Sequence, residues 1–192
     1  MTKERRIDRQ PAFQRSIIKG HLVSCGYSLD DLNTKPIVAV VNSYAEMVAG
    51  HVPLRWVGEQ VKEAIREAGG LPMEFSTIAM CDALGQGHPG MRYSLPSRDL
   101  IADSVEAMIR GQDIFDAIVM LASCDKIVPA MLMAAARLDL PAVIVTGGPS
   151  ANLIAPAESK AARQRFLRGE ISEDELAEVT ARLYSGPGIC SF

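Results

Sequence analysis

Short apolar runs alternate along the chain with segments in which apolar residues recur at every third or fourth position. The runs are typical of strands buried on both faces, whereas the longer period indicates amphipathic helices. This alternation predicts an α/β domain with a mainly parallel sheet flanked by helices, in three layers α/β/α. The predicted strands are 37–41, 73–80, 115–123 and 141–145; the predicted connecting helices are 53–68, a helix after Ser97 as its cap, and a helix from about Pro129 to Arg137.

Each predicted strand ends in polar or reactive residues: Asn42–Ser43, Cys81–Asp82, 124–126 and 146–148. Right-handed crossovers place the carboxyl ends of parallel strands along one edge, where open α/β sheets bind ligands. We therefore expect a site at this edge. Residue types alone do not decide between a site and an ordinary strand-to-helix turn at Cys124, Asp125 and Lys126. In the turn, the thiol would be buried, the Asp–Lys pair would be solvated, and Asp125 could cap the helix.

The composition changes at both ends of this pattern. Residues 1–35 are predicted as an arm and a helix, 36–155 as the α/β core, and 156–192 as two charged helices that lead to a cysteine loop. Ser172 and Glu175 fit a capping box at the start of the second of these helices. Because the chain stops at a glycine-rich turn that carries Cys190, we expect an amino-terminal part, truncated before a carboxyl-terminal domain.

Composition excludes several classes of protein. The 192 residues are 48% hydrophobic and 22% charged with a net charge of −3, as in an ordinary soluble globular protein. There is no basic excess for nucleic acid or an anionic membrane, no run of transmembrane length and no secretory signal, so a cytoplasmic protein is expected. The four cysteines show no CxxC spacing that would indicate zinc; we expect Cys25 to be a packing residue and Cys81 to be a small core or loop residue.

The motifs at the strand ends resemble those of the dihydroxy-acid dehydratase/phosphogluconate dehydratase family. The resemblance covers about 36–192, and segment 93–106 is its most specific part. The matching residues are Asn42–Ser43, Gly50–His51, 81–87, 90–98, 101–106, 124–126, 147–149 and 187–190.

The resemblance implies a hydro-lyase that converts a 2,3-dihydroxy acid to a 2-keto acid with an iron–sulfur cluster and Mg²⁺. It implies that Cys124 and Cys190 bind the cluster, and that Asp82, Asp125 and a carboxylated Lys126 bind Mg²⁺. Thiolates suit iron and carboxylate oxygens suit magnesium, so the residue types agree with these roles. In the family the proton-abstracting serine lies in the carboxyl-terminal domain, so no catalytic base is expected within residues 1–192 and this part alone is expected to be inactive.

Some points stay open. Gly50 stands where some relatives have a third cysteine ligand, which leaves the third ligand and the cluster type, 2Fe–2S or 4Fe–4S, undecided. His51 and His88 could orient substrate or cluster, or make structural hydrogen bonds. The leading interpretation is a dihydroxy-acid dehydratase of branched-chain amino-acid biosynthesis, a homodimer at full length with a small hydroxy acid as its substrate. The alternatives are a sugar-acid dehydratase acting on phosphogluconate, gluconate or a pentonate, and a folded fragment without catalytic activity.

Overall fold

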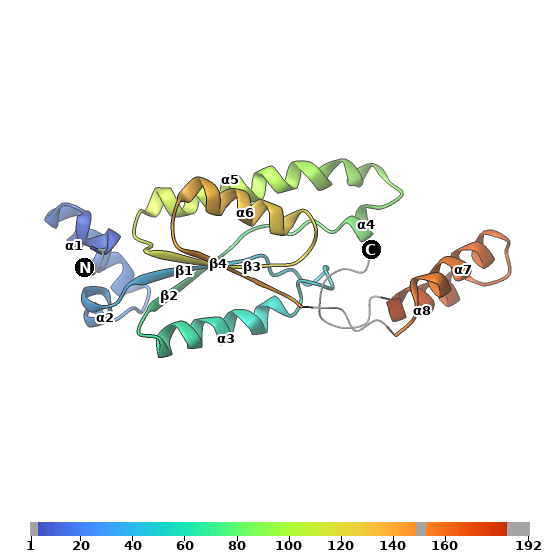
Figure 1. The fold of residues 1–192 in the computed structure, drawn as a ribbon, viewed down its shortest axis with the longest axis horizontal. Helices are drawn as coiled ribbons and strands as arrows, with labels where there is room; N and C mark the ends of the chain where they lie inside the picture. Colours follow the sequence, from blue (N-terminus) through green and yellow to red (C-terminus); the bar gives the residue numbers. More distant parts are fainter. Residues whose placement is uncertain (1–3, 149–152, 184–192) are drawn as a thin grey trace.

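A four-stranded sheet, parallel throughout, forms the centre of the molecule (Figure 1). The computed structural model describes residues 4–148 and 153–183. The strand order is β2-β1-β3-β4, and Val40 in β1 is aligned with Glu74 in β2 and with Val119 in β3. The strands are β1 Ile37–Asn42, β2 Leu71–Ser76, β3 Ala117–Ala122 and β4 Ala142–Thr146.

Helices cover both faces of this sheet, which confirms the predicted fold class. Helices α5 (Ser94–Gln112) and α6 (Ile127–Leu138) lie side by side on one face, and α3 (Leu54–Glu67) lies on the other (Figure 1). The chain therefore winds outward from β1 in one direction and from β3 in the other. The topological switch point of such a sheet, where ligands bind, lies between the carboxyl ends of β1 and β3.

Alternation along the strands explains the two layers of core. Val40 and Leu121 point to the α3 face, where they pack with Leu54. Their neighbours along the strands, Val41 and Met120, belong to the larger core under α5 and α6. All five side chains are fully buried, as expected of parallel strands sandwiched between helices.

The amino-terminal arm packs at the opposite edge of the sheet from the strand carboxyl ends. It comprises η1 (Arg6–Arg9), α1 (Ala12–Ser24) and α2 (Leu29–Thr34), and the fully buried Ile7 and Leu32 join the main core. Asp116 secures the arm, because its carboxylate accepts hydrogen bonds from the backbone N–H of Arg6 at 2.7 Å and of Ile37 at 2.9 Å.

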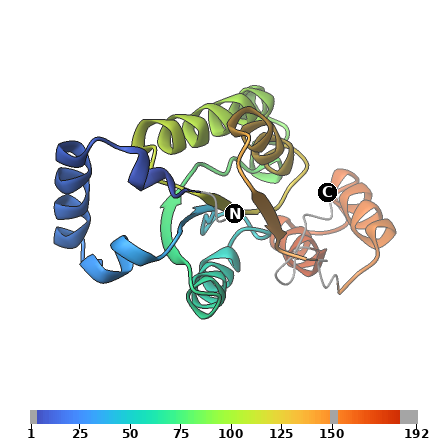
Figure 2. The same ribbon diagram turned by 60° about the vertical axis from the view of Figure 1, so that its left-hand side comes forward.

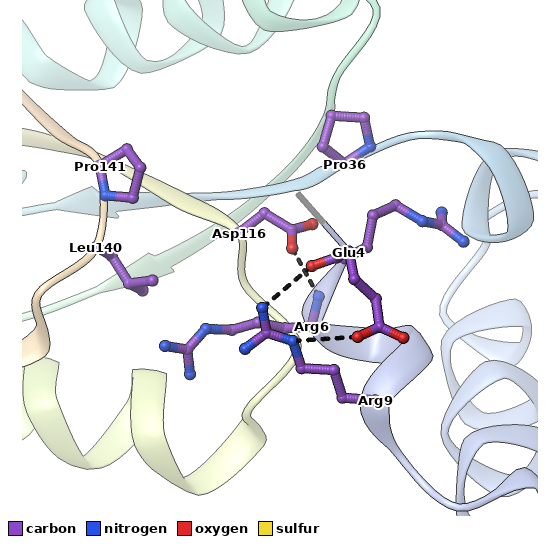
Figure 3. A pocket seen from close by; sticks show the side chains of 8 residues that line it. Glu4, Arg6, Arg9, Pro36, Asp116, Leu140 and Pro141 are labelled. Atoms are coloured by element: carbon purple, nitrogen blue, oxygen red, sulfur yellow. Dashed lines mark hydrogen bonds and ion pairs between the residues drawn. The ribbon is translucent and has the colours of Figure 1, made fainter. Parts of the chain in front are cut away.

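A cavity of about 250 Å³ lies between this arm and the sheet, lined by Glu4, Arg5, Arg6, Arg9, Pro36, Asp116, Leu140 and Pro141 (Figure 3). Each of its three arginines is paired with a carboxylate. Arg5 also donates to three backbone carbonyls of residues 32–35. The arginines of this cavity therefore serve to hold the arm in place.

Helices α7 (Pro156–Leu167) and α8 (Glu173–Leu183) pack against each other beyond the carboxyl end of β4 (Figures 1 and 2). The capping box predicted at the start of α8 is confirmed: Ser172 Oγ accepts from the Glu175 N–H at 3.2 Å, and Glu175 Oε2 accepts from the Ser172 N–H at 2.7 Å. The domain boundaries at residues 35 and 155 stay a prediction. No helix in the described ranges is both long and apolar enough to cross a membrane.

Three local predictions are wrong. Strand β2 ends at Ser76, not residue 80, because its partner β1 ends at Asn42, which pairs with Ser76. Ser97 does not cap α5: the helix begins at Ser94, and the buried Ser97 hydroxyl donates to the Ser94 carbonyl at 2.6 Å. Asp125 does not cap α6, which has Lys126 at its N-cap position and no side-chain cap there.

Candidate active site

Polar residues at the ends of β1, β3 and β4 are joined by hydrogen bonds, as the parallel topology requires of neighbouring strand ends. The Ser43 hydroxyl oxygen, just after β1, lies 2.7 Å from the Leu121 carbonyl oxygen of β3, and the Ser43 N–H donates to the same carbonyl at 3.1 Å. The Gly147 N–H, just after β4, donates to the Ser123 hydroxyl at 3.0 Å. The strand-end residues therefore form one continuous polar edge across the switch point.

The second feature of this edge is an ion pair between Asp82 and Lys126. Asp82 begins the short helix α4 (Asp82–Gly85), and its Oδ1 lies 2.8 Å from Lys126 Nζ. The same oxygen accepts a 2.5 Å hydrogen bond from the hydroxyl of Ser94, the first residue of α5. Lys126 is only 4% exposed, so three segments far apart in the sequence meet at a largely buried charge.

The pKa of Asp82 follows from these contacts. Burial would raise it, but the hydrogen bonds from Lys126 and Ser94, together with the positive charge of Lys126, hold the pKa below its ordinary value. Asp82 therefore presents an ionised carboxylate at neutral pH. With one oxygen held by Lys126 and Ser94, its orientation is fixed.

The structure brings together two of the three predicted magnesium ligands and leaves the third apart. Asp125 is exposed and makes no side-chain hydrogen bond or ion pair with any described residue. In residues 4–148 and 153–183, no three His, Cys, Asp or Glu side chains lie close enough to hold a metal ion. Because a lysine carries no oxygen in its unmodified form, Lys126 could enter a cation site only after carboxylation.

Cys124 occupies an unusual backbone conformation two residues after β3. Its φ is +76°, in the left-handed region, and it is 8% exposed. The other described non-glycine residues with positive φ, Asp113 and Asp139, are the C-caps of α5 and α6, where this conformation is common. Cys124 instead precedes the start of α6, and a left-handed cysteine outside a helix C-cap costs about 1–3 kcal/mol, a strain that proteins keep mainly at functional sites. The second predicted cluster ligand, Cys190, lies outside the described residues.

His51, in the turn between β1 and α3, is fully buried and joins the polar edge. Its Nδ1 lies 2.7 Å from the Ser43 carbonyl oxygen and its Nε2 lies 2.9 Å from the Ser123 carbonyl oxygen. Burial lowers the pKa of His51, and the two carbonyl contacts only partly offset this effect. His88, in contrast, is exposed, and among the described residues its side chain bonds within its own turn, to the Leu84 carbonyl oxygen and the Gly90 N–H.

Sequence reasoning left the role of His51 open and missed the Ser94–Asp82 contact, because no local pattern indicates either one. The interpretation of Cys25 as a packing residue is wrong, since Cys25 is exposed at the end of α1. Cys81 is partly buried and packs against the core, in agreement with the expected packing or loop role.

A doubly wound α/β domain that places a thiol, a carboxylate and a buried lysine at the carboxyl edge of its sheet has the construction of an enzyme domain. Residues 35–192 match the family model described as dihydroxy-acid/6-phosphogluconate dehydratase N-terminal. The chain therefore belongs to the dihydroxy-acid/6-phosphogluconate dehydratase family, which confirms the predicted resemblance.

Three similar curated proteins are each named dihydroxy-acid dehydratase. The dihydroxy-acid dehydratase of Methanothermobacter thermautotrophicus is 44% identical over 188 residues, covering 93% of this chain and 33% of the relative. That of Pyrococcus abyssi is 52% identical over 143 residues, covering 74% of this chain and 24% of the relative. That of Methanobrevibacter smithii is 44% identical over 187 residues. The chain spans at most about a third of the length of these relatives.

Proposed function

We propose that this chain is the amino-terminal part of a hydro-lyase that removes water from a 2,3-dihydroxy carboxylic acid and yields a 2-keto acid. The observation that carries the proposal is the Asp82–Lys126 pair, which lies at the same strand-end edge as the strained Cys124. The names of the curated relatives support the same activity.

The donor atoms of these side chains are of the kinds that suit the two groups that this chemistry uses in the family. Cys124, together with Cys190, would hold an iron–sulfur cluster, because thiolates are the usual cluster ligands. Asp82, Asp125 and a carboxylated Lys126 would hold Mg²⁺, because hard cations take oxygen ligands. When bound, the cluster supplies a Lewis-acidic iron for the departing 3-hydroxyl group, and the cation neutralises negative charge on the substrate.

Lys126 has two roles that depend on its modification. As an ammonium it neutralises Asp82 at 2.8 Å. Carboxylation replaces that positive charge with an anionic oxygen donor, so two negative groups then face each other in a largely buried place. Like charges at this distance repel unless a cation lies between them. We therefore expect carboxylation of Lys126 and cation binding to be linked.

Other residues of the edge orient these groups. Ser94 donates to Oδ1 of Asp82 and thereby fixes the direction in which the carboxylate points. We place the base that removes the proton from carbon 2 outside residues 1–192, and we expect this chain alone to show no turnover.

The substrate follows from an assay of the full-length protein. We expect dehydration of 2,3-dihydroxyisovalerate, and loss of activity in Asp82→Asn, with Asp30→Asn at an exposed position of α2 as a control. The family description also names 6-phosphogluconate dehydratase, so a sugar acid is the second candidate. Faster turnover of 6-phosphogluconate, gluconate or arabinonate would favour that alternative, and no turnover of any of these acids by the loaded protein would contradict the hydro-lyase proposal.

A further inference from the structure

The fully buried His51 has no role in the chemistry described so far, yet it lies at the switch point itself. Buried polar groups in folded proteins are almost always paired. The two ring nitrogens of His51 lie against the carbonyl oxygens of Ser43 and Ser123, at 2.7 Å and 2.9 Å. The ring therefore spans the gap between the carboxyl ends of β1 and β3.

The contact with Ser123 bears directly on Cys124. The Ser123 carbonyl belongs to the peptide group on the amino-terminal side of the Cys124 Cα. The peptide group on the other side is held as well, because the Cys124 carbonyl accepts a hydrogen bond from the Val128 N–H at 3.2 Å. Both peptide planes that flank this Cα are thus held, and their relative orientation is set by the φ of +76° together with ψ. A strained conformation of this kind persists only when its surroundings fix it.

The hydrogen-bonding inventory indicates which ring nitrogen carries the proton. A neutral imidazole has one N–H, and a carbonyl oxygen can only accept. If Nε2 carries the proton, it donates to Ser123, and the Ser43 hydroxyl, 3.0 Å from Nδ1, can donate to that nitrogen. The Leu121 carbonyl, which the Ser43 hydroxyl would release, still accepts from the Ser43 N–H at 3.1 Å. In the Nε2–H form both ring nitrogens thus have a partner, whereas in the Nδ1–H form, which would donate to the Ser43 carbonyl at 2.7 Å, Nε2 would face the Ser123 carbonyl oxygen with no proton between them.

From this arrangement we propose that His51 is a positioning residue for Cys124: by donating from Nε2 to the Ser123 carbonyl, it holds the left-handed turn that presents the thiol for binding iron. The proposal rests on the proposed function only in its last step, the binding of iron by Cys124. Hydrogen-bonding partners of this kind around a metal site typically change metal affinity by about 10- to 100-fold when they are removed.

The first test needs no iron. Nitrogen-15 NMR of the 192-residue chain reports which ring nitrogen of His51 is protonated, and carbon shifts with scalar couplings report the φ of Cys124. We expect the Nε2–H form and a left-handed Cys124. A His51 ring protonated at Nδ1 alone would overturn the proposal.

Variants supply the second test. His51→Phe keeps a ring but removes the donor, His51→Gln restores an N–H donor, and His21→Gln alters a histidine on the distant helix α1. We expect His51→Phe to lose the left-handed signature at Cys124 and to bind iron about 10-fold or more weakly after anaerobic reconstitution. His51→Gln should lie within a few-fold of the wild type, and His21→Gln should match it.

A folded His51→Phe chain that keeps both the left-handed Cys124 and wild-type iron affinity would refute the positioning role. If His51→Phe fails to fold, the protonation of the wild-type ring and the behaviour of His51→Gln decide the question. A wild-type chain that takes up no iron would contradict the proposed function. The NMR results would still decide whether His51 holds the left-handed conformation of Cys124.

Discussion

The left-handed backbone at Cys124 allows a quantitative prediction about stability. We compare glycine with alanine at position 124, since both substitutions remove the thiol and differ only in the Cβ atom. For an L-residue the left-handed conformation costs about 1–2 kcal/mol, whereas glycine adopts it freely. Alanine at this position therefore carries the strain, and glycine does not.

The reference is Ala122, a fully buried residue of β3 with ordinary strand geometry two positions earlier. There Ala122→Gly should destabilise the fold by about 1.5 kcal/mol, from the greater backbone freedom of glycine and one lost buried methyl group. At position 124 the relief of strain offsets this cost. We expect the stability of Cys124→Gly to lie within about 0.5 kcal/mol of that of Cys124→Ala, in either direction.

Urea unfolding followed by circular dichroism measures the difference in stability between glycine and alanine at position 122 and at position 124. A chelator is present so that bound metal does not contribute. The slope of the transition should be the same in all variants if each unfolds in two states. If Cys124→Gly is less stable than Cys124→Ala by the same amount as the glycine variant at position 122, the backbone at Cys124 is not strained and the reasoning from its φ fails.

Three further predictions concern the ion pair, the packing of α3 and the pH dependence. Asp82→Asn leaves the buried Lys126 without an anion and should lower the free energy of unfolding, measured in urea, by about 3 kcal/mol. Adding Lys126→Met should recover part of that loss, and equal stability of Asp82→Asn and the wild type would contradict the ion pair. Gly58→Ala should destabilise by about 1–3 kcal/mol, because the new Cβ would lie 2.9 Å from a side-chain atom of the buried Asn42, whereas Gly20→Ala on α1 meets nothing and should be neutral or stabilising. Folding lowers the pKa of His51, so the stability that this histidine contributes is complete above its ordinary pKa of 6.5. As the pH falls from 6.5 towards the pKa of the folded protein, that stability is lost at up to about 1.4 kcal/mol per pH unit. His51→Gln should flatten this part of the plot of stability against pH, and an unchanged slope would refute the lowered pKa of His51.

The fold class could be predicted because its signals are local. The run that became β1 is apolar on both faces, and the helix that became α3 shows its period plainly, so a parallel sheet between helices follows from composition and spacing. The convergence of Asp82 and Lys126 at one edge follows from the same topology, since parallel strands share their carboxyl ends.

The remaining features depend on contacts between distant segments. The strand order, which puts β1 beside β3, depends on which face each helix covers, and no local pattern encodes that choice. The end of β2 was predicted too late because its partner strand ends first. The contact between His51 and Ser123 joins residues 72 positions apart. The positive φ of Cys124 is equally invisible in a sequence that shows only a cysteine between a serine and an aspartate.

The central claim is that Cys124 at the end of β3 binds iron. Its most direct test is the iron content per chain after anaerobic reconstitution with iron and sulfide, for Cys124→Ser against Cys25→Ser, which alters an exposed cysteine on the distant helix α1. We predict that Cys25→Ser keeps the iron and the brown chromophore of the wild type and that Cys124→Ser loses both. An unchanged iron content and spectrum in Cys124→Ser would contradict the claim.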